Sequence, residues 1–93
     1  MNVRYLHSFD KTVHDLEERE RTDTNNAVDA LLSYFETGQR PQGLGLKKLR
    51  GHYWEIRAGI KIRILFSLEK DLLTFIVAGN HDTIRRFLRN NTI

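Results

Sequence analysis

The sequence predicts an α+β fold in which a small antiparallel sheet is packed against helices, because two hydrophobic periodicities occupy different parts of the chain. Residues 27–35 carry apolar side chains three and four positions apart, the spacing of an amphipathic helix. Residues 53–79 carry them at alternate positions or in short runs between turn residues, as strands do. The 93 residues are expected to form one domain spanning 1–93, since so short a chain cannot support two cores.

The N-terminal part predicts a short strand followed by helix. In "VRYLHSF", residues 3–9, polar and apolar side chains alternate loosely, which favours a strand. From Asp10 the spacing becomes helical, and the polar side chains of residues 24–26 could cap a helix that begins at Ala27. Gly38 is expected to end it. Whether residues 10–37 form one bent helix or a helical hairpin stays open.

The C-terminal part predicts three strands and a helix. A glycine-containing loop with the single proline is expected to lead into the strand "HYWEIRAG", and "AG" to form a hairpin turn. The strand from Ile60 to Leu68, the strand "LLTFIVAG" and the helix "DTIRRFLRN" follow. The order is therefore β-α-α-β-β-β-α, with the N-terminal helices packed on one face. Trp54 and Ile60 would face the core, and the other face would stay open and basic.

Charge is distributed unevenly along the chain. Residues 1–37 hold four basic and eight acidic side chains, a net charge of −4, whereas residues 38–93 have a net charge of +7. Segregated positive charge attracts phosphate backbones or acidic proteins. The sequence contains no cysteine, so thiolate metal sites and disulfides are excluded. It shows no apolar run long enough for a membrane span, and we expect a cytoplasmic protein without a metal or cofactor.

Basic side chains within the predicted strands suggest a phosphate site. Arg57 and Arg63 would lie on adjacent strands and face the same way, where two guanidinium groups could clamp a phosphodiester. Lys61 would share their face. The alternative is that the arginines form cross-strand ion pairs with Glu55 or Glu69.

Two further side chains could take part in nucleic-acid chemistry. His81 follows the last strand, and histidine exchanges protons near physiological pH, although a surface histidine flanking the helix explains its position as well. Asp82 could cap that helix. Tyr53 could stack on a base, since alternation directs Trp54 into the core. The arginines of the last helix form either a phosphate-contacting stripe or a solvated face.

"LKKLRGHYWEIRAGIKIRILFSL" followed by "FIVAGNH" resembles the RelE/ParE superfamily of type II toxin–antitoxin toxins, especially its RelE, YoeB and HigB branches. The resemblance covers the chain in element order and is most specific over Leu46 to His81. It implies a small antiparallel sheet backed by N-terminal helices. It also implies a metal-independent endoribonuclease, or mRNA interferase, which cleaves mRNA in the ribosomal A site through attack by the ribose 2′-hydroxyl and so inhibits translation.

The resemblance implies roles for individual residues. Arg63 matches a phosphate-stabilising arginine, Arg57 is similar to a basic residue of HigB-type relatives, and His81 falls where YoeB-like toxins have a catalytic histidine. In these toxins, basic residues just before the second strand bind RNA or ribosomal RNA. Lys47, Lys48 and Arg50 match those residues. Together with Lys61 and Tyr53 these form the expected RNA-binding set.

The sequence departs from the family pattern in two places. YoeB-like toxins have a glutamate base just before the second strand, where this chain has Gly43, Leu44 and Gly45. The base would then be Glu55, a lysine or His81 itself. The C-terminal catalytic tyrosine of RelE is also missing.

Two toxin functions therefore follow as hypotheses, beside a third interpretation in which the protein acts only by binding and neither cleaves mRNA nor inhibits gyrase. The first is an endoribonuclease toxin that acts on mRNA at the ribosome, near the 16S rRNA of the A site. The second is a non-enzymatic inhibitor of DNA gyrase, similar to ParE. Both imply a cognate antitoxin that covers the basic face in a hetero-oligomeric complex.

Overall fold

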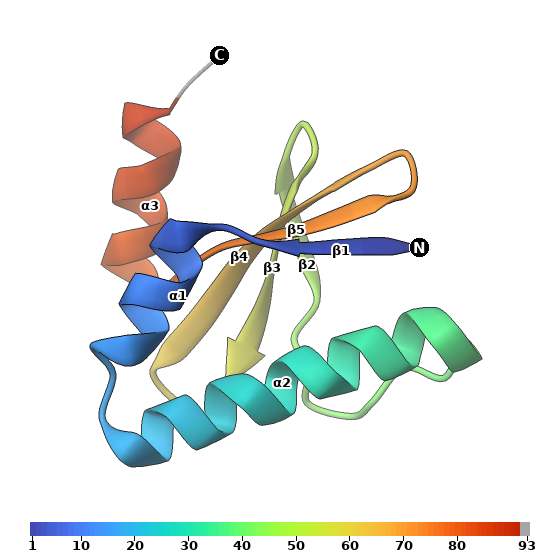
Figure 1. Ribbon diagram of the computed structural model, residues 1–93, viewed down its shortest axis with the longest axis horizontal. Helices are drawn as coiled ribbons and strands as arrows, with labels where there is room; N and C mark the ends of the chain where they lie inside the picture. Colours follow the sequence, from blue (N-terminus) through green and yellow to red (C-terminus); the bar gives the residue numbers. More distant parts are fainter. Residues whose placement is uncertain (92–93) are drawn as a thin grey trace.

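A computed structural model, which describes residues 1–91, has a five-stranded sheet with helices on both faces (Figure 1). The strand order is β1-β5-β4-β3-β2, and all neighbours are antiparallel except β1, which pairs in parallel with β5. The predicted α+β class is confirmed. The elements are β1 (Asn2–Tyr5), α1 (His7–His14), α2 (Glu18–Thr37), β2 (Lys47–Arg50), β3 (Tyr53–Ala58), β4 (Ile62–Glu69), β5 (Leu72–Gly79) and α3 (His81–Asn90).

The first strand is shorter than predicted. It ends at Tyr5, and the N–H of Leu6 donates to the Phe75 carbonyl at 3.0 Å before the chain turns into α1. The Ser8 hydroxyl then donates to the Ile76 carbonyl at 2.6 Å, which ties the first turn of α1 to β5. Phe9 is buried as expected for an apolar side chain, but it belongs to α1 and not to the first strand. The alternation of polar and apolar side chains predicted a strand as far as Phe9. A helix that begins at His7 also buries Phe9, its third residue, so the alternation did not distinguish the two.

The helical region consists of two helices, which settles the alternative that the sequence left open. The break falls at residues 15–17, and α2 begins with a capping box in which the Glu17 N–H donates to the Glu20 carboxylate at 3.3 Å. The predicted start after residues 24–26 is wrong, since Thr24 is buried inside α2. Gly38 ends α2 in the left-handed conformation, as predicted.

The basic segment that the sequence assigned to a loop contains an additional strand, β2. It pairs with β3 through Lys47 and Glu55 and through Lys48 and Trp54, with an irregularity before Arg50. The Lys48 ammonium lies 5.9 Å from the centroid of the Trp54 ring. Lysines and an irregular register are typical of an edge strand that discourages further pairing.

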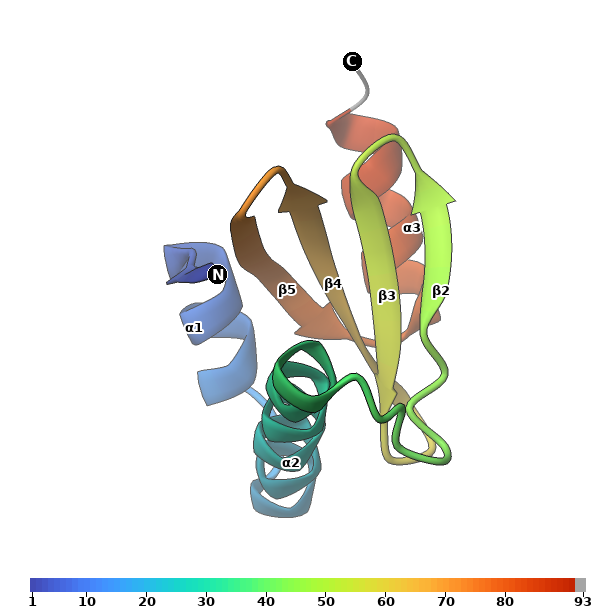
Figure 2. The ribbon, with the colours of Figure 1, turned by 90° about the vertical axis from the view of Figure 1, so that its right-hand side faces the viewer.

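Two apolar clusters hold the sheet between helices (Figure 2). The first lies under α1 and α2, as predicted, and includes Ile64, Phe66 and Phe75. The second lies under α3 and contains Leu65 and Ile84 with their neighbours. The prediction that this second face stays open is therefore wrong. The short C-terminal helix covers part of it because both faces of β4 and β5 carry apolar side chains.

The turn between β3 and β4 lies outside both clusters. It contains residues 59–61, and Gly59 adopts a positive φ of 71°. Ile60, which was expected in the core, has 99% of its surface exposed. Lys61 lies in the turn and not in a strand, so strand alternation does not determine its direction. The sequence misplaced both residues because the hairpin loop is longer than "AG".

Ile64→Ala is expected to lower the free energy of unfolding by about 2–5 kcal/mol, because it opens a cavity in a fully buried site. Ile60→Ala makes the same chemical change at an exposed site and is expected to stay within about 0.5 kcal/mol of the parent. Urea unfolding measures both values. Equal losses in the two variants would contradict the observed register of β4.

Candidate functional site

The predicted catalytic residues lie near one end of the sheet. Arg57 on β3 is paired with Arg63 on β4, and Arg63 is paired with Gly79 at the end of β5. Two residues later His81 begins α3. Because residues paired across strands point to the same face, both arginines share one face, as predicted, and it is the face that α3 partly covers. Like charges in this position repel unless an anion lies between or beside them.

An acidic side chain accompanies this arginine pair. The Nη1 of Arg63 donates to Oε2 of Glu55 at 2.9 Å, in an ion pair whose side chains are 27% and 5% exposed. The cross-strand ion pair that the sequence kept as an alternative is therefore present for Arg63. It holds the guanidinium in a defined position and offsets part of the local positive charge. The remaining exposed edge of Arg63 still reaches solvent.

Arg57 is positioned by the loop before β2. Its backbone N–H donates to the Leu44 carbonyl at 2.9 Å, and its side-chain stem lies against Gly45. A Cβ at Gly45 would come within 2.8 Å of the Arg57 Cγ, and Gly45 has a φ of +64°. Both features favour glycine at this position. Gly45 thus allows the loop to lie against the arginine.

His81 is the first residue of α3 and is exposed. The preceding Asn80 caps the helix, because its Oδ1 accepts from the Thr83 N–H at 2.9 Å. The alternative that Asp82 is the cap is therefore wrong. The cap fixes where the helix begins, and it places the histidine backbone at the same end of the sheet as the arginine pair.

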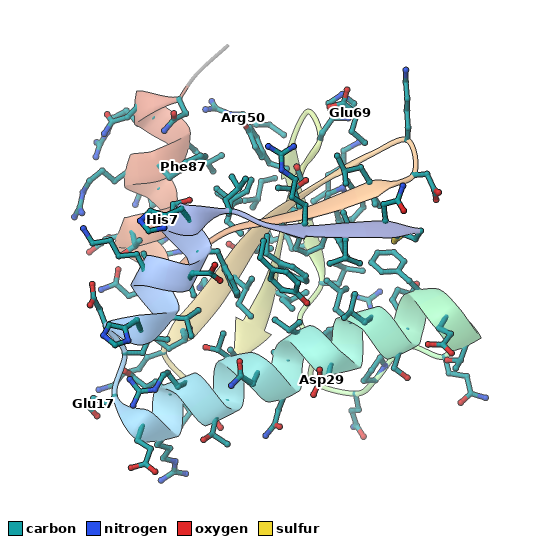
Figure 3. The ribbon with its side chains drawn as sticks, viewed as in Figure 1. His7, Glu17, Asp29, Arg50, Glu69 and Phe87 are labelled. Atoms are coloured by element: carbon teal, nitrogen blue, oxygen red, sulfur yellow. The ribbon has the colours of Figure 1, made fainter. Side chains whose placement is uncertain are left out.

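A groove of about 560 Å³ lies toward the other end of the same face, between the sheet and the last turns of α3. Tyr53 and Phe87 meet there edge to face, with ring centroids 6.2 Å apart. The Arg50 guanidinium donates to the Leu88 carbonyl. Figure 3 shows Arg50, Glu69 and Phe87 gathered at this end. The groove contains two residues of the predicted RNA-binding set and none of the predicted catalytic residues.

The remaining members of the RNA-binding set do not share one surface. Lys47 is paired with Glu55 and so faces the α3 side, whereas Lys48 faces Trp54 on the opposite side. Lys61 borders a separate cavity that also contains Glu20 of α2. The sequence treated these cations as one group because their spacing does not reveal the irregularity in β2 or the length of the turn.

Arg4 is a groove residue that sequence reasoning missed. It lies on β1, pairs with Thr74 of β5 and borders the groove beside Ser67 and Glu69. No local signal could have found it, because a parallel pairing joins segments that are 70 positions apart.

Within residues 1–91 no three His, Asp or Glu side chains are grouped so that they could hold a metal ion. Over the same residues, no helix has the length and apolar character needed to cross a membrane.

Comparison with known proteins gives structural matches only. No protein-family model matches the chain, and no curated protein matches its sequence. Among solved structures, the E. coli DinJ-YafQ toxin-antitoxin complex contains a chain that is 19% identical, with a TM-score of 0.67 over 89% of this chain and 94% of that one. The RelB-RelE antitoxin-toxin complex of Methanococcus jannaschii gives 16% identity and a TM-score of 0.66 over 90% and 96%.

A third similar structure is the YoeB/ParE toxin from Agrobacterium tumefaciens, with 18% identity and a TM-score of 0.63 over 87% of this chain and 99% of that one. Each match covers nearly the whole of both chains. At these identities the likeness concerns the fold: the chain has the RelE-like fold that its sequence resembles.

Arg63→Ala is expected to lower the free energy of unfolding by about 3 kcal/mol, because it leaves the buried Glu55 carboxylate without its partner. The double variant Arg63→Ala with Glu55→Gln removes that uncompensated charge and is expected to recover part of the loss. Chemical unfolding of the two single variants and the double variant measures the coupling. Strictly additive losses would show that the pair contributes nothing to stability.

Proposed function

We propose that this chain is the toxin of a type II toxin–antitoxin system and acts as a metal-independent endoribonuclease that cleaves mRNA on the ribosome. The observation that carries the proposal is the pairing of Arg57 with Arg63 at the end of the sheet where His81 begins α3. Two guanidinium groups on one face of the sheet, with a histidine at the start of the helix that follows, match the needs of phosphodiester cleavage. The likeness to toxins of this fold supports the assignment.

The proposed reaction is an internal transesterification of the RNA. The ribose 2′-hydroxyl attacks the adjacent phosphorus, so an O2′–P bond forms while the P–O5′ bond breaks. A base takes the proton of the 2′-hydroxyl, and an acid gives a proton to the 5′-oxygen. The products are a 2′,3′-cyclic phosphate and a 5′-hydroxyl end. Arg57 and Arg63 stabilise the negative charge that the phosphoryl oxygens gain in the transition state, and His81 transfers a proton.

Glu55 serves this site as a positioning residue. Its carboxylate is buried and already accepts a hydrogen bond from Arg63, so it is poorly placed to take a proton from RNA. The base is then His81 itself or a lysine, and the other of these two groups gives the proton to the 5′-oxygen. Lys47 is the lysine that shares the face of Glu55.

The groove under α3 is the proposed docking site for the part of the RNA that extends from the reacting phosphate toward the other end of this face. Tyr53 offers an aromatic ring and Arg4 a cation at its border, which suits a base and a phosphate. A cognate antitoxin is proposed to bind the toxin in a hetero-oligomer, supported by the antitoxin-bound chains among the similar structures. Ribosome-dependent action would place the protein in the cytoplasm.

His81→Ala is expected to reduce cleavage of a translated reporter mRNA by about 100-fold or more, the usual contribution of proton transfer. Primer extension after brief induction locates and quantifies the cuts. His7→Ala is the matched control, since His7 is an exposed histidine that begins α1 outside the site. Both variants change exposed side chains and should keep the parent stability.

Unchanged cleavage in His81→Ala would remove His81 from the mechanism. Growth arrest with intact mRNA would contradict the nuclease and favour the ParE-like alternative, which a DNA gyrase supercoiling assay with purified protein then tests.

Arg57→Ala is expected to lower the cleavage rate by about 100-fold, because one of two groups that stabilise the transition state is lost. Arg57 tests the clamp more cleanly than Arg63, since it is exposed and its removal strands no buried carboxylate. Lys61→Ala removes a cation from the nearby turn and is expected to keep most of the activity. A similar loss in both variants would indicate a general charge effect in place of a clamp.

A further inference from the structure

The last residues of β5 have a neighbouring strand on one side only. β1 pairs with β5 from Leu72 to Phe75, whereas β5 continues to Gly79. Beyond Phe75 the strand pairs with β4 alone, and Gly79 lies opposite Arg63. These last residues are buried, so their backbone groups on the other side need hydrogen-bond partners from another part of the chain.

An irregularity in β5 decides which backbone groups these are. Between the partners of the neighbouring β4 residues Leu65 and Phe66, β5 contains one additional residue, Ile76. Ile76 and Val77 both contribute to the cluster under α3, although successive residues of a regular strand point to opposite faces. Because the additional residue reverses the alternation, the Ile76 carbonyl and the Ala78 N–H both face the edge beside α1 (Figure 1).

Two hydroxyl groups of α1 take the place of the missing strand. The Ser8 hydroxyl donates to the Ile76 carbonyl at 2.6 Å. The Thr12 hydroxyl accepts from the Ala78 N–H at 3.0 Å. Its single hydrogen is directed to the carbonyls of Ser8 and Phe9 in its own helix, at 2.8 and 2.9 Å, which leaves the oxygen able to accept. Thr12 therefore links the backbone of α1 to the end of β5.

The bond to Thr12 holds the chain shortly before His81. Gly79 follows Ala78, and a Cβ at Gly79 would lie only 2.8 Å from the Cβ of Thr83, so the first turn of α3 packs closely on the end of β5. The cap of α3 then fixes where the helix begins. A shift of Ala78 would therefore pass to His81 through a short and closely packed segment.

We propose that Thr12 is a positioning residue for His81 in the cleavage reaction. By holding the Ala78 N–H, its hydroxyl fixes the end of β5 and so the place of His81 relative to the phosphate that the two arginines bind. Proton transfer requires the imidazole to lie within hydrogen-bond reach of the reacting oxygen, so a small displacement lowers the rate. This role rests on the proposed nuclease function, since it matters for cleavage only if His81 transfers a proton.

Thr12→Val removes the hydroxyl while keeping the shape of the side chain, and Thr12→Ser keeps the hydroxyl. Single-turnover cleavage of mRNA on purified ribosomes, at increasing toxin concentration, separates the rate in the bound complex from binding. Thr12→Val is expected to lower the plateau rate by about tenfold and to leave the half-saturating concentration within about twofold of the parent value. Thr12→Ser is expected to keep both values.

An unchanged plateau rate in Thr12→Val, or an equal loss in Thr12→Ser, would overturn the proposal. If Thr12→Val does not fold, Thr12→Ala takes its place, because it also lacks the hydroxyl and alanine favours the helix.

Two further variants separate positioning from general effects on the fold. Thr22→Val makes the same chemical change on α2, where the exposed hydroxyl donates to the Glu18 carbonyl of its own helix at 3.2 Å, and it is expected to leave the rate unchanged. Ser8→Ala removes the other bond between α1 and β5, farther from His81, and is expected to lower the plateau rate less than Thr12→Val. Equal losses in the Ser8 and Thr12 variants would indicate general docking of α1 and would overturn the proposal.

A double variant tests whether Thr12 acts through His81. In the His81→Ala background, Thr12→Val is expected to cause no further loss of the residual rate, because the group that it positions is absent. The same fold loss in both backgrounds would show that Thr12 acts on something other than His81 and would overturn the proposal.

NMR of the ¹⁵N-labelled protein tests the same link without RNA. Thr12→Val is expected to speed the amide hydrogen exchange of Ala78 and to shift the resonances of His81, whereas those of His52, in the turn between β2 and β3, should stay in place. A parent protein that cleaves no mRNA would overturn the proposed function and this role with it. A parent protein that cleaves mRNA, with neither its rate nor its spectrum changed by Thr12→Val, would overturn the positioning role alone.

Discussion

The burial of β4 and β5 on both faces is the constraint on which the rest of the molecule depends. Leu65 lies in one apolar cluster, while its neighbours Ile64 and Phe66 lie in the other, so neither face of these strands can be left in water. Helices must cover both sides: α1 and α2 cover one, and α3 covers the other (Figure 2). Within β4 and β5 the charged side chains lie only near strand ends, at Arg63 and Glu69.

This confinement explains the shape of the candidate site. Arg63 belongs to a strand whose centre is buried, but it sits near the strand's beginning, where β5 ends and α3 begins. Glu55 offsets the free-energy cost of partly burying the Arg63 guanidinium, because an ion pair and hydrogen bond replace part of the hydration that Arg63 loses. The same pair makes Arg63 an ambiguous target for mutagenesis, since its removal disturbs both charge and stability. Arg57 and His81 are exposed and report on function more directly.

Acidic side chains from the N-terminal part of the chain and basic side chains from the C-terminal part lie at different places in the fold. Acidic side chains of the N-terminal helices border a groove beside β1, whereas the paired arginines lie on the α3 side of the sheet. The fold therefore places these acidic and basic side chains on opposite faces of the sheet.

The sequence by itself determined the α+β class, the order of most elements and the shared face of Arg57 and Arg63, because these follow from periodicities of a few residues. It did not determine where β1 ends, that β2 is a strand, or that Ile60 and Lys61 lie in a turn, since these depend on which distant strand offers hydrogen bonds. Only the tertiary structure decided that Glu55 binds Arg63, that Arg4 joins the groove and that α3 covers a face expected to be open. Each of these features depends on which segments of the chain pair or pack together, and the local spacing of polar and apolar residues does not determine that.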